Sequence, residues 1–244
     1  MYENDVVQRL LADRPSFHLS GSAHWDVLPA TLRAIHRVVR PGNVTLEVGA
    51  GVSTVVFTAA GARHTAVSPD PAEHRMIREY CKEIGVDDTN LEFLVGFSED
   101  VLSAHLTRER TLDVGMVDGA HSFPLPVLDW YYVARALKVG GKLLLDDVPV
   151  PAVMPTFQHM KREPVWRLDG LLDSRAAEFT LLREPPTGDE WRHQAFNRHY
   201  PDYSYLSLSS RMLLSGGYRA RTLRAAMGHR FPALRQFYKD HSST

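Results

Sequence analysis

The 244-residue sequence predicts an α/β fold with a doubly wound, mostly parallel sheet. Short apolar runs alternate with helical segments up to about residue 150, which is the pattern of such sheets. Beyond that point, two β-type runs follow each other with too little chain between them for a large helix. We expect those two runs to pair antiparallel, as a hairpin at the edge of the sheet.

The elements follow in order after a helical stripe that ends at Pro41-Gly42. The predicted strands are 44–48, 64–67, 91–95, 114–117 and 142–145, followed by the hairpin strands 165–168 and 179–182. Helices are predicted at 54–60, 73–84 and 125–137. Lys138 to Gly141 is predicted to stop the last helix, because glycines rarely continue one.

Three regions are expected along the chain: an N-terminal helical cap (1–40), a cofactor-binding core (41–184) and a C-terminal helical appendage (185–244). The appendage contains many arginines and tyrosines and ends in a helical stretch from about 220 to 238. It could be a lid, an oligomer contact or a packed addition, so a homo-oligomer is left open.

Composition narrows the class of protein. A hydrophobic content of 44% is enough for a core, and a net charge of -1 gives no reason to expect nucleic acid or an anionic membrane as a partner. The single cysteine, Cys81, rules out an internal disulfide and a thiolate metal cluster. The N-terminus lacks the features of a signal peptide, and no apolar run approaches membrane-spanning length. We therefore expect a cytoplasmic protein.

A glycine turn follows the first predicted strand and precedes a helix. Glycines let the backbone approach a ligand closely, and a helix N-terminus offers unpaired N–H donors. A dinucleotide fingerprint would need a third glycine where Thr54 stands. S-adenosylmethionine has a cationic sulfonium group, which would explain the acidic Glu47 next to the turn. The alternative interpretation is that the glycine segment is an ordinary tight turn without a ligand. The residues of this segment expected at the cofactor are Glu47, Gly49, Ala50, Gly51, Ser53 and Thr54.

Ribose recognition normally uses an acidic residue about 20 positions after such a turn, at the end of the next strand. Asp70 stands there, and Ser68 lies nearer the strand end. We predict both residues at the cofactor, with Asp70 as a plain turn residue beside Pro71 as the alternative.

Acidic clusters end two neighbouring strands of the predicted sheet. Asp118 closes one of them, and Asp146 and Asp147 close the next. The carboxyl ends of parallel strands share one edge, so these carboxylates should crowd together and repel one another unless a cation lies between them. Carboxylates suit Mg²⁺, Mn²⁺ or Ca²⁺. We therefore predict a divalent cation at Asp118, Asp146 and Asp147.

His121 follows Asp118 by three residues and should face the same crevice. Imidazole titrates near neutral pH, which suits a general base for a substrate hydroxyl. Each residue also has a simpler interpretation: Asp118-Gly119 as a turn, the aspartates at 146 and 147 as loop caps, and His121 as a hydrogen-bonded linker.

These motifs together resemble class I S-adenosylmethionine-dependent methyltransferases, and more narrowly the metal-dependent O-methyltransferases of natural-product sugars, of the mycinamicin and macrocin type. The shared features are the Glu-x-Gly-x-Gly turn at 47–51, Asp-Gly-x-His at 118–121 and the strand ending in Asp146-Asp147. The resemblance covers about residues 40–183 and implies a Rossmann-like methyltransferase fold with the paired edge strands. It also implies a cofactor site lined by Glu47, Gly49 and Gly51, to which we add Asp118.

The sequence departs from the family pattern in two places. Ser68 stands where the family usually has an acidic residue, so the ribose contact could move to Asp70. Phe97 occupies a position that is often acidic, and it could stack on adenine or belong to the core.

The resemblance implies an O-methyltransferase that uses S-adenosylmethionine and Mg²⁺ on a small-molecule hydroxylated acceptor. Two alternatives stay open: a metal-independent N- or O-methyltransferase, and a catalytically silent cofactor-binding subunit of a biosynthetic complex. A dehydrogenase is disfavoured by the incomplete glycine fingerprint.

Overall fold

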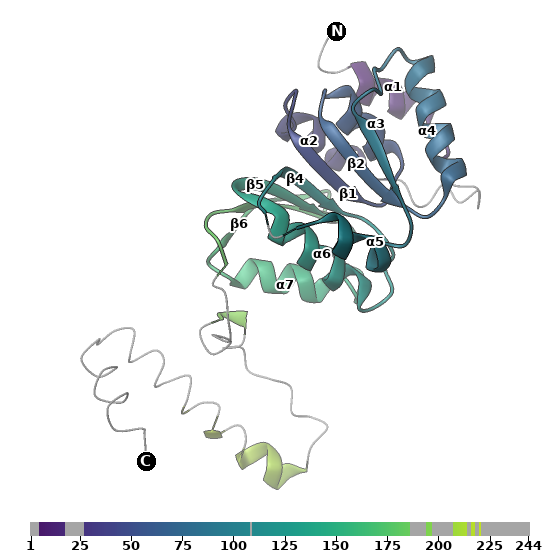
Figure 1. Ribbon diagram of the computed structural model, residues 1–244. Coiled ribbons are helices and arrows are strands. Elements are labelled where there is room, and N and C mark those ends of the chain that lie inside the picture. The colour runs from purple at the N-terminus through teal and green to yellow at the C-terminus, as the bar shows by residue number, and fades with distance from the viewer. Residues whose placement is uncertain are drawn as a thin grey trace. The chain divides into compact units, whose positions relative to one another are not determined.

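The computed structural model describes residues 5–17, 27–107, 109–185, 194–196, 207–213, 216–217 and 220. The chain divides into two compact units, Met1–Pro186 and Thr187–Thr244. The first unit contains the sheet and both its helical layers (Figure 1). The predicted terminal helix at 220–238, apart from residue 220, and the tyrosines near residue 200 lie outside the described residues.

A seven-stranded sheet with the strand order β3-β2-β1-β4-β5-β7-β6 is the centre of the first unit (Figure 1). The strands are β1 (Val44–Val48), β2 (Arg63–Ser68), β3 (Leu91–Val95), β4 (Leu112–Val117), β5 (Leu137–Leu145), β6 (Trp166–Leu172) and β7 (Ala176–Leu181). The first five pair in parallel, whereas β7 runs antiparallel to both β5 and β6. The predicted doubly wound sheet with an antiparallel edge hairpin is confirmed.

Helices cover both faces of this sheet. The helices are α1 (Asp5–Asp13), α2 (Pro29–Val38), α3 (Val52–Ala59), α4 (Pro71–Glu83), α5 (Ser98–His105), α6 (Leu125–Ala136) and α7 (Met154–Arg162). Contacts link α1 to α4 as one layer and α5 to α7 as the other. None of the helices within the described residues has the length and apolar character needed to cross a bilayer.

The strands are apolar because both of their faces are buried. Met116 of β4 and Leu144 of β5 pack into the cluster formed with α1 to α4. Their neighbours Val117, Leu143 and Leu145 pack into the second cluster, with α6 and α7. Successive side chains of a strand point to opposite faces, so a continuous apolar run is what a doubly covered sheet requires.

The start of β5 differs from the prediction. Lys138 to Gly141 belong to β5 instead of stopping α6, and the strand begins at Leu137 directly after the helix. Leu137 pairs with Leu112, but Lys142 already pairs with Val114, so the extra residues are taken up as an irregularity in the ladder. Glycine is common at irregularities in strands as well as at helix ends, because it adopts unusual backbone conformations easily. The helices α5 and α7 had no sequence prediction.

Candidate functional site

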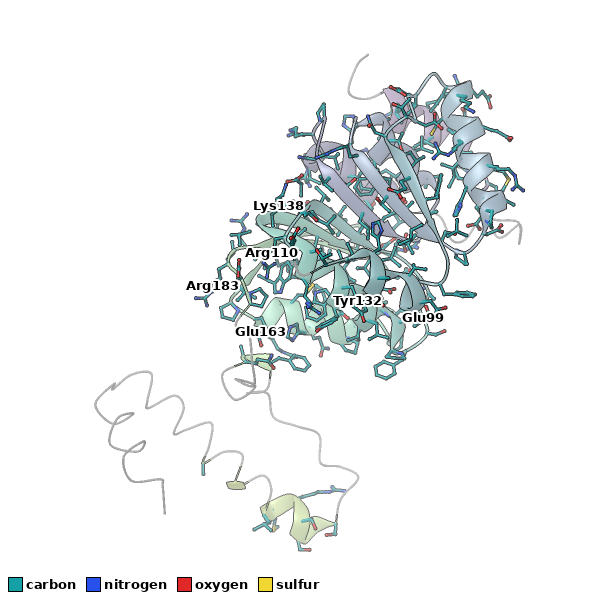
Figure 2. The ribbon with its side chains drawn as sticks, viewed as in Figure 1. Glu99, Arg110, Tyr132, Lys138, Glu163 and Arg183 are labelled. Atoms are coloured by element: carbon teal, nitrogen blue, oxygen red, sulfur yellow. The ribbon has the colours of Figure 1, made fainter. Side chains whose placement is uncertain are left out.

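A cavity of about 1260 Å³ opens at the carboxyl ends of the five parallel strands, β1 to β5. Its wall combines the predicted glycine turn with segments that follow the other strands. Figure 2 shows at which end of the sheet this cavity lies. Glu99 of α5 lines the cavity, whereas Lys138, near the amino-terminal end of β5, lies well apart from it. The predicted site residues on this wall are Gly49, Ala50, Gly51, Ser53, Ser68, Asp70, Phe97, Asp118, His121 and Asp147. The loops after the parallel strands therefore meet around one space, as expected for this type of sheet.

Gly49 sits where the loops after β1 and β4 touch. Its φ is 104°, and a Cβ built there would lie 2.4 Å from the carbonyl oxygen of Asp118. The amide of Gly49 donates to the Val67 carbonyl (2.9 Å), and the amide of Asp118 donates to the Val48 carbonyl (3.0 Å). Only glycine meets both the conformational and the steric requirement at this position.

Glu47 and Thr54 do not line the cavity. The Thr54 hydroxyl donates to the Glu47 carboxylate, and the amide of Gly51 donates to the same hydroxyl at 3.0 Å. The carboxylate also lies 3.1 Å from Nε2 of His64, whose Nδ1 is 2.8 Å from the Thr45 hydroxyl. Glu47 is 1% exposed. The structure thus places Glu47 behind the glycine turn, holding it through Thr54, and not on the wall that would face the cofactor.

Two polar side chains, Ser68 as the last residue of β2 and Asp70 just after it, lie on the cavity wall. Asp70 caps α4, since its Oδ1 accepts from the amide of Ala72 at 2.8 Å, in agreement with the turn interpretation. The Ser68 hydroxyl donates to the Glu73 carboxylate at 3.1 Å, and Glu73 also lines the cavity. Sequence reasoning missed Glu73, although an acidic residue in the first turn of the helix after β2 was a visible signal.

Phe97 lines the cavity with 60% of its surface exposed. The core interpretation of this residue is therefore wrong. An exposed ring on the cavity rim offers an apolar face to a flat ligand.

Asp118, His121 and Asp147 come together on the same wall. One ligand atom from each lies within 4.8 Å of the others. Nε2 of His121 is 3.0 Å from Oδ2 of Asp147 and 4.0 Å from Oδ1 of Asp118. Within the described chain, this Nε2 forms no hydrogen bond, so the 3.0 Å contact lacks hydrogen-bond geometry. Burial, followed by the charges of Asp146 and Asp147, raises the pKa of Asp118 well above its ordinary value.

Asp146 is not part of this group. The side chain is 1% exposed, and neither carboxylate oxygen has a hydrogen-bond partner among the described residues. Burial raises the pKa of Asp146. A buried carboxylate without hydrogen bonds calls for a compensating charge nearby.

Arg175, in the turn between β6 and β7, supplies a positive charge that sequence reasoning missed. Its Nε donates to Oδ1 of Asp147 at 2.7 Å, its Nη2 lies 3.4 Å from Oδ2, and its Nε is 3.7 Å from Oδ1 of Asp146. The repulsion that led us to expect a bound cation is therefore relieved in part by the chain itself. No sequence signal marks Arg175, because it lies 28 positions after Asp147 in a hairpin turn.

Residues 46–148 match a family described as "Methyltransferase domain". This stretch contains all the strands of the parallel sheet except the first two residues of β1, and it ends just after Asp147. The chain is therefore similar to a methyltransferase domain over the part of the sheet that carries the glycine turn and the aspartates after β4 and β5.

Solved structures share this fold. An O-methyltransferase described as putative from Klebsiella pneumoniae is 18% identical, with a TM-score of 0.57 over 73% of this chain and 90% of that one. The O-methyltransferase from Bacillus cereus in complex with SAH is 15% identical, with a TM-score of 0.54 over 74% and 90%. The O-methyltransferase TomG from Streptomyces achromogenes, involved in tomaymycin synthesis and solved with SAM, is 17% identical, with a TM-score of 0.51 over 74% and 89%. No curated protein matches the sequence.

Proposed function

We propose that this protein is an O-methyltransferase that transfers the methyl group of S-adenosylmethionine to a hydroxyl of a small-molecule acceptor. The cavity, at about 1260 Å³, exceeds the size of an ordinary single-ligand pocket, which supports room for a cofactor and an acceptor together. The names of the similar structures point to oxygen as the methylated atom. A hydroxylated natural product, including its sugars, is the acceptor class that the motif resemblance favours.

The observation that carries this proposal is the position of His121 beside Asp147 on the wall shared with the glycine turn. His121 takes the proton of the acceptor hydroxyl, and the neighbouring carboxylate of Asp147 stabilises the resulting imidazolium. The acceptor oxygen then forms a bond to the sulfonium methyl as the carbon–sulfur bond breaks, leaving S-adenosylhomocysteine. Since the methyl donor is already activated, much of the rate comes from holding the two reactants in line.

The donor set also fits a divalent cation. Divalent cations such as Mg²⁺ and Mn²⁺ prefer carboxylate oxygens as ligands. Asp118 and Asp147 each present a carboxylate oxygen, within 4.8 Å of one another, and the buried carboxylate of Asp146 nearby has no hydrogen-bond partner in the described chain. Asp118 and Asp147 would hold the cation, which when bound would lower the pKa of an acceptor hydroxyl. Asp146, the third predicted ligand, lies outside the group of facing donors.

A second candidate is the metal-independent N- or O-methyltransferase. Arg175 favours it, because a guanidinium already lies against Asp147 and near Asp146. In this version the carboxylates need no further cation, and His121 and alignment alone carry the reaction.

Two measurements test these candidates. Calorimetry should show S-adenosylmethionine binding to the purified protein with and without Mg²⁺. Methyl transfer to a panel of hydroxylated acceptors, measured with Mg²⁺ and with excess chelator, separates the two enzyme candidates: chelation should abolish the metal-assisted reaction and leave the other unchanged. Cofactor binding without transfer to any acceptor would instead support a silent binding subunit.

A further inference from the structure

We propose that Arg175 is a tethered competitor of the divalent cation: its guanidinium and the metal take turns at Asp147. This inference rests on the metal-assisted form of the proposed function. It concerns the β6–β7 turn, which lies outside the matched methyltransferase domain at residues 46–148.

The backbone holds Arg175 in place against the acidic segment. The carbonyl oxygen of Arg175 accepts from the amide of Val148, directly after Asp147, at 2.8 Å. Its own amide donates to the Leu172 carbonyl at 3.0 Å. The residues before it, Asp173 and Ser174, have φ values of 48° and 58°. Left-handed backbone at both central residues is what a tight two-residue hairpin turn requires, so the turn fixes the point from which Arg175 emerges.

The backbone and the carboxylate of Asp147 are also fixed in position on the other side of this contact. Its φ of 51° is also left-handed. Both of its carboxylate oxygens face the guanidinium, at 2.7 Å and 3.4 Å, and one of them also lies 3.0 Å from His121. A guanidinium that contacts both carboxylate oxygens is a well-aligned charged pair. A metal ion that binds Asp147 must therefore displace this pair or share its oxygens.

The charges of the site explain why the two cations compete. Donor oxygens of Asp118 and Asp147 lie within 4.8 Å of one another, and Nε of Arg175 is 2.7 Å from Asp147 and 3.7 Å from Asp146. Removing the charge of Arg175 would leave the three carboxylates without this opposing positive charge, which strengthens their attraction for a divalent cation. We expect Arg175 to weaken metal binding and so to keep the metal exchangeable.

The test is Mn²⁺ binding to the full-length protein, followed by electron paramagnetic resonance of free Mn²⁺. Arg175→Gln should bind Mn²⁺ about tenfold more tightly than the wild type, because one unit of opposing charge near the ion is lost. Arg175→Lys keeps the charge but not the paired contact, so it should lie in between. Arg167→Gln is the matched control, because it removes a partly exposed arginine of the same hairpin that pairs with Asp169 and not with Asp147.

A measurement on the wild type guards against misfolded variants. In spectra of ¹⁵N-labelled arginine side chains, the Nε–H resonance of Arg175 should move on saturation with Mg²⁺, and that of Arg167 should not. If the wild type binds Mn²⁺ and Arg175→Gln binds it equally well or more weakly, the competition is overturned but the metal site is not. An Arg175 resonance that does not move on saturation with Mg²⁺ would also overturn the competition alone. No Mn²⁺ binding by the wild type or any variant overturns the metal assignment too, while cofactor binding and methyl transfer test the enzyme proposal separately.

Discussion

The carboxylate of Glu47 lies 3.1 Å from Nε2 of His64, in the interior between β1 and β2. From the other side, it accepts a hydrogen bond from Thr54, which in turn accepts from the amide of Gly51 in the glycine turn. A chain of hydrogen bonds thus runs from the middle of the sheet to the loop expected to meet the cofactor. Glu47 acts on that loop from behind.

Glu47→Gln should weaken S-adenosylmethionine binding, because the glycine turn loses a charged anchor. A hydrogen bond to a charged group contributes about 1.5–3 kcal/mol, so we expect the dissociation constant to rise roughly tenfold to a hundredfold. Isothermal calorimetry measures this change. Glu178→Gln is the control, since Glu178 is also buried (2% exposed) but pairs with Arg37 and Lys142. Equal losses of affinity in both variants would contradict a specific effect on the turn.

His121→Gln should abolish turnover and leave cofactor binding largely intact, because the hydroxyl loses its proton acceptor. General base catalysis contributes roughly 10²- to 10⁴-fold in rate, so kcat should fall by that factor. Asp147→Ala should have a comparable effect. His105→Gln, at the exposed end of α5, serves as the control. Full activity of His121→Gln would remove this residue from the mechanism.

Gly49→Ala should reduce both stability and cofactor binding. A methyl group there meets the Asp118 carbonyl at 2.4 Å in addition to the strain of a φ of 104°. Gly85→Ala separates the two causes, because Gly85 has a φ of 74° with nothing within 4 Å of the added Cβ. We expect about 1–2 kcal/mol for strain alone at Gly85, and more at Gly49. Urea unfolding and calorimetry of both variants measure this difference; equal costs would show that the close approach to Asp118 is unimportant.

Asp129 should make stability depend on pH. Burial raises the pKa of this α6 carboxyl to about 6, and its oxygens have no hydrogen-bond partner in the described chain. Between these two values the folded state therefore holds a proton that the unfolded state, in which the carboxyl has its ordinary pKa of 3.8, has already lost. Stability from this group is present below about pH 4 and is lost as pH rises to 6, by up to about 3 kcal/mol.

The measurement for Asp129 is urea unfolding of the wild type and of Asp129→Asn at pH 4 and pH 7. The asparagine variant cannot ionise, so its stability relative to the wild type should increase between these two values. Subtracting the two proteins removes the contribution of other titrating groups. Parallel curves would show that folding does not raise the pKa of Asp129.

The fold was predictable because its signals are local. Val44–Val48 and Leu91–Val95 are short apolar runs bounded by polar or glycine residues, and the structure has both strands at those bounds. α5 was missed because its eight residues bury only Ser98 and Leu102, which is too little for a recognisable apolar stripe. Lys138 to Gly141 was assigned to a helix stop because a glycine pair is equally typical of a helix end and of an irregularity in a strand, and the local sequence does not distinguish the two.

The sequence alone determined that the glycine turn and the aspartates after β4 and β5 share one edge of the sheet, because parallel strands connected by helices all end on the same side. Only the tertiary structure decided which of these side chains face the cavity. Glu47 turns away toward His64, Asp146 is buried, and Asp147 meets Arg175 from a distant hairpin. Such contacts depend on side-chain direction and on charges brought together across 17 residues of chain for Glu47 and His64 and 28 for Asp147 and Arg175, and neither leaves a periodic pattern in the sequence.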